Sequence, residues 1–426
     1  MIVSKYVDLF FLCCLHFITI RGQSSNVQTR LNPGCALIQS TIYCFGGNTR
    51  LIPDGKGEEF AGAPINEHIA LDLDQFGDNF SRLNYNNVQW SNVSNTIDST
   101  LLEPIGYQSA TTLFSDNSYI IYGGYPVQST KSLDRPFLHY NPKTDTWKQL
   151  SLLNGNNYTT QAPILNLGND TIWTYGGYIN NTKTDTVEVI NNFDYKTLKW
   201  MSQTPFSGPL GIDYTATLAY DNVIYIIGGV FKRSGLITQT TFDYITIFDT
   251  QKLSWDNFRA NGSDPTPRVG HSTIEVPNKK LLIVYGGRRY GSTVDSKLND
   301  YYYVYDIARR VFTPCGAADK TKTRFGHFAA LYKSRYLLLS FGYVNRNRTA
   351  DSLTVIDVDD PYIPVWLSGI SNDNETNSNN EMENKVGLGP ILDLGKLIPA
   401  IVVPIVAAIL VMCWYRYFLL YQTSDS

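Results

Sequence analysis

The chain has 426 residues, of which 17% are charged, and it contains 29 Tyr, 20 Phe and 32 Gly residues. Aromatic side chains suit the half-buried faces of β-strands and Gly suits tight turns, so the composition favours an all-β protein over a helical bundle. The formal net charge of −3 excludes the large Lys and Arg excess that a surface tracking nucleic-acid phosphates requires. We therefore expect no nucleic-acid partner.

Residues 1–22 have the pattern of a cleavable secretory signal. Lys5 precedes an apolar run over residues 9–20, and Gly22 stands before the polar residues 23–25. The run has 12 residues, which is short for a membrane span and favours a signal over an uncleaved anchor. We predict that residues 1–22 are removed on export and that the chain after them is extracytoplasmic.

Cys35 and Cys44 flank a two-residue turn. If that turn pairs Ile38 with Thr41, antiparallel register places Cys35 directly opposite Cys44. Opposed Cβ atoms lie about 4.5–5.5 Å apart, so an oxidising compartment makes a disulfide the prediction, with two reduced core cysteines as the alternative. Cys315 is then the unpaired thiol of the exported part, buried or in an intermolecular bridge.

Apolar runs that end in a glycine pair recur along the chain, as in IYCFGG, YIIYGG and LIVYGG. The first glycines of five copies and the lone glycine of a degenerate sixth copy are Gly46, Gly123, Gly176, Gly228, Gly286 and Gly342. A large aromatic residue follows each of them, at Trp90, Trp147, Trp200, Trp255, Phe312 and Trp366. Each unit spans about fifty residues and predicts four short strands, one ending at the glycine pair and one bearing the aromatic residue.

A four-stranded unit exposes apolar faces that only a neighbouring sheet can cover, and radial stacking of such sheets gives a β-propeller. An Arg-x-Gly-His sequence precedes the last two glycine landmarks, at Arg268, Gly270 and His271 and at Arg324, Gly326 and His327. Together with the glycine pairs and the spaced aromatic residues, this pattern resembles the kelch repeat, including its galactose-oxidase-related branch. The resemblance covers about residues 28–370 and implies an all-β kelch propeller, which we predict to have six blades and to form the ectodomain, residues 23–370.

Two departures from the pattern bear on the number of blades. The first copy has a longer interval between its landmarks, which we assign to an insertion near residues 48–67. Seven blades are the alternative if the stretch around residues 52–70 forms more than a loop. The sixth copy has Tyr343 where a second glycine is expected, and no additional strand for closing the ring is evident.

The galactose-oxidase-like branch implies a copper site with two His ligands and a Tyr joined to a Cys. His271 and His327 occupy equivalent repeat positions, which indicates a repeated structural role instead. His139 lies within a strand pattern, and His68 lies in or after the long first insertion. We therefore expect a binding protein with no catalytic residue, no metal and no cofactor. A copper oxidase or other propeller-borne enzyme is one alternative, and a structural luminal scaffold is another.

Eight Asn-x-Ser/Thr sequences make N-glycosylation an expectation for an exported chain. The acceptors are Asn79, Asn92, Asn157, Asn169, Asn180, Asn261, Asn347 and Asn374.

The loops that join the second and third strands share one face with the connections between blades, and they include the long segments 48–67, 125–135, 230–241 and 288–299. Long loops on a rigid scaffold usually carry recognition. The cations of this loop face are Lys131, Arg135, Lys232, Arg233, Arg288, Arg289, Arg346 and Arg348. We predict that the face binds an acidic or polyhydroxylated ligand, either a protein or a polysaccharide. Ordinary solvated loop charges are the alternative.

The C-terminal part predicts a stalk, a membrane span and a short tail. Residues 371–385 are rich in Asn and Glu, so we read residues 371–396 as a flexible stalk. Residues 397–414 carry no charge and as a helix are about 27 Å long, which fits a bilayer core. We predict a transmembrane helix at 397–420 and a cytoplasmic tail at 421–426. Arg416 and the polar ending disfavour a lipid-anchor signal, so the chain is predicted to be a single-pass type I membrane glycoprotein of the cell surface or a secretory-pathway membrane.

Overall fold

The computed structural model of the protein describes residues 27–49, 51–53, 59–84, 88–93, 105–106, 109–126, 137–150, 159–160, 162–179, 189–200, 204–205, 211–233, 236–291, 298–316, 323–345, 348–349 and 353–367. All of them belong to one compact unit, Met1–Asn372. The predicted signal (1–22), stalk (371–396), span (397–420) and tail (421–426) lie outside the described residues. Among the described residues, no helix has the length and apolar character needed to cross a bilayer.

The described residues form six sheets of four or five strands, which follow one another along the chain. The first sheet comprises β1 (Gly34–Ile38), β2 (Thr41–Phe45), β5 (His68–Asp72) and β6 (Ser91–Asn92). The second comprises β8 (Ser109–Leu113), β9 (Ser118–Tyr122), β11 (Phe137–Asn141) and β12 (Thr146–Leu150). The third comprises β14 (Ile164–Asn166), β15 (Thr171–Tyr175), β17 (Val189–Asp194), β18 (Lys199–Trp200) and β19 (Thr204–Pro205).

The remaining three sheets repeat the same order. The fourth comprises β21 (Thr215–Leu218), β22 (Val223–Ile227), β25 (Tyr244–Asp249) and β26 (Ser254–Arg259). The fifth comprises β28 (Ser272–Val276), β29 (Leu281–Tyr285), β30 (Tyr302–Asp306) and β31 (Val311–Pro314), with β27 (Asn261–Gly262) added parallel to β31. The sixth comprises β32 (Phe328–Tyr332), β33 (Tyr336–Ser340), β36 (Thr354–Asp357) and β37 (Val365–Trp366).

Small ladders and two 3-10 turns complete the described structure. The ladders are β3 (Leu51–Pro53) with β4 (Glu59–Ala61), β7 (Ile105–Gly106) with β10 (Tyr125–Pro126), β13 (Thr159–Thr160) with β16 (Tyr178–Ile179), β20 (Gly211–Ile212) with β23 (Val230–Arg233) and β24 (Leu236–Gln239), and β34 (Tyr343–Asn345) with β35 (Arg348–Thr349). The 3-10 turns are η1 (Asp74–Phe76) and η3 (Pro277–Lys279).

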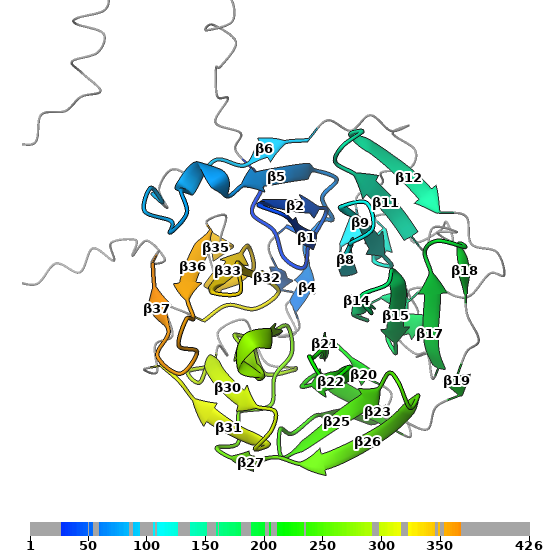
Figure 1. Cartoon of the computed structure of the whole chain (residues 1–426), viewed down its shortest axis with the longest axis vertical. Coiled ribbons are helices and arrows are strands. Elements are labelled where there is room, and N and C mark those ends of the chain that lie inside the picture. Colours follow the sequence, from blue (N-terminus) through cyan, green and yellow to red (C-terminus); the bar gives the residue numbers. More distant parts are fainter. Residues whose placement is uncertain are drawn as a thin grey trace, which may run out of the picture. The chain divides into compact units, whose positions relative to one another are not determined.

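Figure 1 shows the sheets standing around a common centre, with the first strand of each sheet innermost. These inner strands contact one another in chain order, β1 with β8, β8 with β14, β14 with β21, β21 with β28 and β28 with β32. The last of them, β32, contacts β1 again. The described residues therefore confirm the prediction of an all-β propeller.

The second strand of each sheet lies between two neighbouring sheets, which explains its composition. Every residue of β9, β29 and β33 is buried, and these strands read SYIIY, LLIVY and YLLLS. A strand buried on both faces is apolar at nearly every position instead of alternating. Ile283 of the fifth sheet and Leu337 of the sixth belong to one apolar cluster, so each sheet is covered by the next.

The glycine pairs allow this close approach. At Gly286, φ is +70°, and an added Cβ would lie 2.2 Å from the carbonyl oxygen of Arg324 in the following sheet. The sixth copy departs differently from the prediction. Strand register aligns Ser340 with Tyr285, so Phe341 replaces the first glycine and Gly342 is the retained second one. Tyr343 therefore stands after the pair. Phe341 fills the place of the first glycine by adopting the left-handed φ of +62°.

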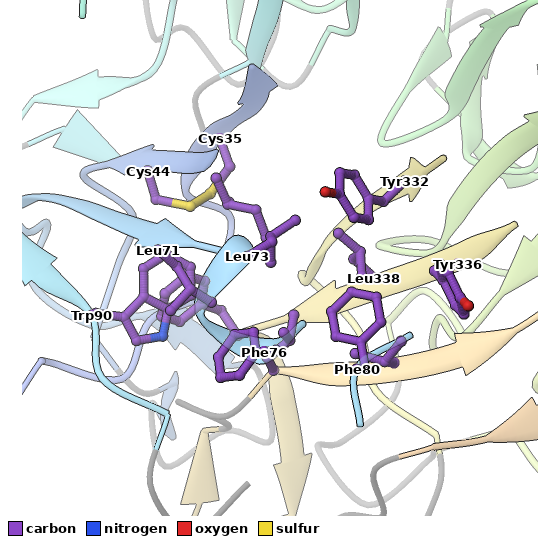
Figure 2. Packing of buried hydrophobic residues seen from close by; sticks show 14 of the residues in the cluster. Cys35, Cys44, Leu71, Leu73, Phe76, Phe80, Trp90, Tyr332, Tyr336 and Leu338 are labelled. Atoms are coloured by element: carbon purple, nitrogen blue, oxygen red, sulfur yellow. A yellow bond between two sulfur atoms is a disulfide. The ribbon is translucent and has the colours of Figure 1, made fainter. Parts of the chain in front are cut away.

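The ring closes through packing between the first and sixth sheets, in which no strand is shared among the described residues. The connection between β5 and β6 runs from Leu73 to Leu83 over the sixth sheet, and we call residues 73–83 the closing segment. Its Phe80 ring lies 5.0 Å from the Tyr336 ring and packs beside Leu338 (Figure 2). Trp90, just after this connection, lies 4.8 Å from Phe341.

The closing segment also changes the interpretation of the long first copy. The short strands β3 and β4 pair with each other within the connection between β2 and β5. A second long connection separates Asp72, the end of β5, from Ser91, the start of β6. The extra length is thus divided between two connections, and the assignment to residues 48–67 alone was wrong. The spacing of landmarks could not reveal this, because both connections lie between the same glycine and the same tryptophan.

The first hairpin carries the cysteine pair. Its register pairs Ile38 with Thr41 and Cys35 with Cys44. The two sulfur atoms are joined by a disulfide, with the Cα atoms 4.1 Å apart. Cys35 and Cys44 belong to the same apolar cluster as Phe80, so the disulfide lies at the closure of the ring (Figure 2).

Replacing Phe80 with Ala should destabilise the propeller by about 3–5 kcal/mol, because it leaves a cavity between the first and sixth sheets. Urea unfolding of the exported propeller measures this change. Phe114→Ala is the matched control, since Phe114 is 61% exposed and its truncation should change stability little. Equal effects of the two substitutions would show that the closing segment does not hold the ring shut.

Candidate binding face

The same small ladder is built at one end of several sheets. In the Arg-x-Gly-His segments, the residue after the arginine pairs with the residue that follows the glycine pair, as Val269 does with Arg288. Phe325 pairs with Tyr343 in the same way, and Leu31 pairs with Asn48 in the first sheet. The start of each long loop is therefore fixed to the segment that enters the sheet. This gives the loop face a rigid base.

Buried arginines support this base. Arg268 is fully buried and donates to the carbonyl oxygens of Thr266, Gly286 and Asp300, at 2.9, 3.1 and 2.9 Å. It also forms an ion pair with the Asp300 carboxylate at 2.8 Å. One side chain thus connects the entering segment, the glycine pair and the end of the following loop.

Arg30 fills the equivalent position in the first sheet, and sequence reasoning missed it. Its guanidinium donates to the Gly46 carbonyl at 3.1 Å and pairs with Glu67 at 2.5 Å. The motif is obscured because Asn32 and a proline stand where Gly and His stand in the later copies. The recurring pairing of an arginine with the glycine landmark 16 to 18 positions later could have revealed it.

Arg324 is the third buried arginine, and it donates to the Phe341 carbonyl at 3.2 Å and to the Thr354 hydroxyl at 2.8 Å. Burial lowers the pKa of Arg30, Arg268 and Arg324 below the ordinary arginine value, while Glu67 and Asp300 act in the opposite direction on the first two. Guanidinium groups start from a pKa above 12, so all three stay charged.

The four histidines after the predicted signal lie in different sheet interfaces. His271 shares a hydrogen bond with Thr215 at 3.2 Å, and His327 shares one with Ser272 at 2.9 Å, each joining one sheet to the preceding one. His68 bonds Tyr119 of the second sheet at 2.8 Å, and His139 bonds Ser118 at 2.7 Å.

Burial lowers the pKa of His68 and of His271 to about 3, so both rings are neutral at physiological pH. Among the described residues, no group of three or more His, Cys, Asp or Glu side chains is arranged to hold a metal ion.

Backbone hydrogen bonds join the segments that enter the fifth, sixth and first sheets. Asn32, Asp213, Gly270 and Gly326 occupy equivalent positions, and their φ angles are +48°, +55°, +64° and +63°. The Asn32 amide donates to the Gly326 carbonyl at 2.8 Å, and the Gly326 amide donates to the Gly270 carbonyl at 2.8 Å. The left-handed conformation thus connects successive sheets around the axis.

Asp213 places a carboxylate at the equivalent position of the fourth sheet, and sequence reasoning did not single it out. Its side chain is partly exposed, yet burial raises its pKa to about 6, and the opposing influence is the charge of Arg288. The Arg288 guanidinium lies over the Phe325 ring at 5.1 Å. Asp213 and Arg288 therefore lie close enough for the charge of Arg288 to act on the Asp213 carboxylate. Aligning residues 211–215 with 268–272 could have found Asp213.

The predicted loop cations fall into three groups. Arg288 is half-buried and Arg289 is exposed, directly after the fifth glycine pair. Lys232 and Arg233 belong to β23, and Arg348 belongs to β35. Lys131, Arg135 and Arg346 lie outside the described residues. The structure therefore places Arg288 within electrostatic reach of Asp213, shows Arg289 exposed beside it, and does not test the binding role of any of these cations.

The other predicted sites are distributed over the surface and the core. The acceptors Asn79, Asn92, Asn169 and Asn261 are exposed, while Asn157, Asn180, Asn347 and Asn374 lie outside the described residues. Cys315 is buried, its thiol lies 3.3 Å from the Thr313 carbonyl, and burial raises its pKa to about 11. That thiol is protonated and unreactive at neutral pH.

Residues 121–357 match the family model described as the Attractin/LZTR1 beta-propeller. The chain belongs to this kelch-type family. The matched part of the Attractin/LZTR1 propeller runs from the second sheet to the sixth and includes the Arg268, Asp213 and Arg288 positions. Kelch propellers typically act as modules that bind other proteins.

Several curated proteins share the propeller at low identity. Acyl-CoA-binding domain-containing protein 4 of Arabidopsis thaliana is 22% identical over 325 residues, which covers 75% of this chain and 43% of that protein. The human Rab9 effector protein with kelch motifs is 27% identical over 120 residues, which covers 28% of this chain and 30% of that protein. Kelch domain-containing protein 3 of Rattus norvegicus is 23% identical over 224 residues, covering 46% and 56%. This chain thus spans less than two thirds of the length of each.

Replacing Arg268 with Met in this Attractin/LZTR1-type propeller should destabilise the fold by about 3 kcal/mol, because it leaves the Asp300 carboxylate and several carbonyl groups without their donor. Methionine keeps most of the side-chain volume, so the loss reports on the charge and the hydrogen bonds. The control is Arg335→Met, which removes an ion pair with Asp357 at the surface and should change stability little. Urea unfolding compares the two, and similar losses would contradict the assigned importance of the buried arginine.

Replacing Asp213 with Asn should raise the melting temperature clearly at pH 7.5 and much less at pH 4. The folded state holds the Asp213 proton up to about pH 6, whereas an unfolded aspartate releases it near pH 4, so stability falls as pH rises through this window. Asparagine stays neutral throughout and tolerates the left-handed backbone.

Asp357→Asn is the control of opposite sign. Its hydrogen bond to Arg335 lowers the pKa of Asp357, so its contribution is present at neutral pH and lost on acidification. A melting-temperature difference for Asp213→Asn that is the same at both pH values would contradict the proposed proton uptake.

Proposed function

We propose that this chain is a membrane-displayed, six-bladed kelch propeller that binds a protein partner through its loop face. The observation that carries this proposal is the half-buried Arg288, which is fixed by backbone bonds to Val269 and is followed directly by the exposed Arg289 and Tyr290. Arginine and tyrosine are enriched among the residues that dominate binding energy at protein interfaces. The human Rab9 effector protein with kelch motifs, whose name indicates a protein partner, supports the same class of ligand.

The rigidity of the base supports recognition at this place. Two backbone hydrogen bonds of 2.9 and 3.0 Å join Val269 to Arg288, and the buried Arg268 holds the segment from below. Residues presented on such a base lose little conformational entropy on binding. The half-buried Arg288 and the neighbouring Asp213 then offer both signs of charge to a partner segment.

The six blades are the six sheets described above, with the contact of β32 and β1 as the closing step. Display on a membrane follows from residues 1–22 as a signal and residues 397–420 as a single span. Residues 371–396 then form a stalk between the propeller and the bilayer, and the propeller faces the extracytoplasmic side. The exposed positions of Asn79, Asn92, Asn169 and Asn261 are compatible with glycans on an exported protein.

A binding function is also supported by the distribution of the histidines. The four rings occupy separate interfaces between sheets, and each shares a hydrogen bond with a side chain of its own or the adjacent sheet. A copper oxidase needs two of these rings on one ion. The hydrogen bonds of His68, His271 and His327 instead join neighbouring sheets. His139 bonds Ser118 of its own sheet and Tyr195 of the next.

The test is binding of a partner isolated with the wild-type ectodomain, residues 23–367, and then purified. Arg289→Glu should weaken that binding by about tenfold to a hundredfold, because it reverses an exposed charge at the centre of the interface. Lys252→Glu is the matched control, since the Lys252 side chain is 79% exposed and lies in the turn between β25 and β26. Unchanged affinity for the Arg289 variant would refute the loop face as the binding site. Isolation of a polysaccharide in place of a protein would refute the partner class alone.

A further inference from the structure

The outer strand of the sixth sheet carries an exposed apolar patch. Tyr362, Ile363, Val365 and Leu367 are 36%, 69%, 54% and 38% exposed, and we call these four residues the end patch. They belong to β37 and the segments that flank it. Single exposed apolar residues are normal on a surface, whereas several in succession mark an interaction site.

Three other outer strands, β12, β26 and β31, are protected in ways that β37 is not. The exposed positions of β12 and β26 carry polar residues, including Lys148, Asp256 and Arg259. The outer strand β31 is covered by β27, through a parallel pairing of residues 261–262 with 311–312. Charges and covering strands are the usual protection of a sheet edge. Within the described residues, β37 pairs with β36 alone.

We propose that the end patch is a contact between two copies of this chain, related by a two-fold axis beside β37. The proposal rests on the membrane display proposed above, which brings copies together in one plane. Identical edge strands that meet across a two-fold axis run antiparallel, so the same backbone groups of each copy can pair. The apolar side chains of the patch then cover one another.

The charges around the patch favour a second copy over other occupants. Asp359, Asp360 and Arg309 are all exposed in the turns beside it. Burial raises the pKa of the Tyr362 phenol, and the charges of Asp306, Arg309 and Asp360 also act on it, which places both signs at the rim. A two-fold rotation can bring the acidic side of one rim onto the basic side of the other. A lipid surface would leave the acidic groups without partners.

The size of the patch explains why the membrane matters. Four partly exposed side chains bury on the order of a few hundred Å² per copy, below the roughly 800 Å² of a stable interface. Such a contact is weak between free molecules. Anchoring in one membrane raises the effective concentration toward the millimolar range, where a weak contact becomes populated.

Cysteine cross-linking of the full-length chain in membranes tests the contact. Val365→Cys, in a Cys413→Ser background, should give a disulfide-linked dimer on mild oxidation, because a residue near a two-fold axis meets its own copy. The control is Phe114→Cys, which replaces an apolar residue of similar exposure in the turn between β8 and β9. We expect at least tenfold more dimer for Val365→Cys than for Phe114→Cys. Equal yields would overturn the proposal, since they report random collision.

A second substitution separates this contact from a lipid-binding patch. Ile363→Asp added to Val365→Cys should abolish the dimer. The melting temperature of the propeller should stay unchanged, because Ile363 is exposed. An undiminished dimer in the double variant would overturn the two-copy contact. The contact would also be overturned if neither variant formed a cross-link and Ile363→Asp abolished binding to phosphatidylcholine vesicles. Extraction of the chain from membranes by carbonate would instead refute the proposed display. If the display is refuted, the same cysteine variants are cross-linked in the concentrated ectodomain. A higher dimer yield for Val365→Cys than for Phe114→Cys would support the contact, and equal yields would overturn it.

Discussion

The structure depends on one constraint, which is that each small sheet can bury its apolar faces only against the next sheet. This explains why second strands such as β29 and β33 are buried along their whole length and largely apolar, and why Ile283 and Leu337, from adjacent sheets, share one core. It also explains the glycine pairs, because a Cβ at Gly286 would collide with the Arg324 carbonyl of the following sheet. The repeat is therefore a consequence of packing, and its landmarks are the positions where neighbouring sheets come closest.

A ring built in this way must join its first and last sheets, which are far apart in the sequence. Here the closing segment and the disulfide-bonded hairpin meet the sixth sheet, so local elements of the first repeat hold the ring shut (Figure 2). Phe341, in place of a glycine, packs against Trp90 at this junction. The irregular features of the first and sixth repeats thus belong to the same interface, and each makes sense only beside the other.

The loop face combines a conserved architecture within the chain with residues that differ from sheet to sheet. Arg30 and Arg268 form the same ion-paired support in the first and fifth sheets, whereas the left-handed position next to them holds Asn32, Asp213 or glycine. Support and recognition are therefore separated. The charged pair of Asp213 and Arg288 can vary without loss of the hydrogen bonds that build the base. At the outer side of the ring, β37 has exposed apolar residues where β12 and β26 carry charge and β31 is covered by β27, and this difference sets the sixth sheet apart.

The sequence by itself determined the all-β class, the propeller, the four-stranded unit and the register that opposes Cys35 to Cys44, because each follows from spacing along one repeat. It also indicated that His271 and His327 have equivalent structural positions. Only the tertiary structure decided the alignment of Phe341 with the first glycine, the path of the closing segment and the proximity of Asp213 to Arg288. The physical reason is that these features depend on contacts between residues of different sheets. Periodicity reports what every repeat shares, and such contacts arise where the repeats differ.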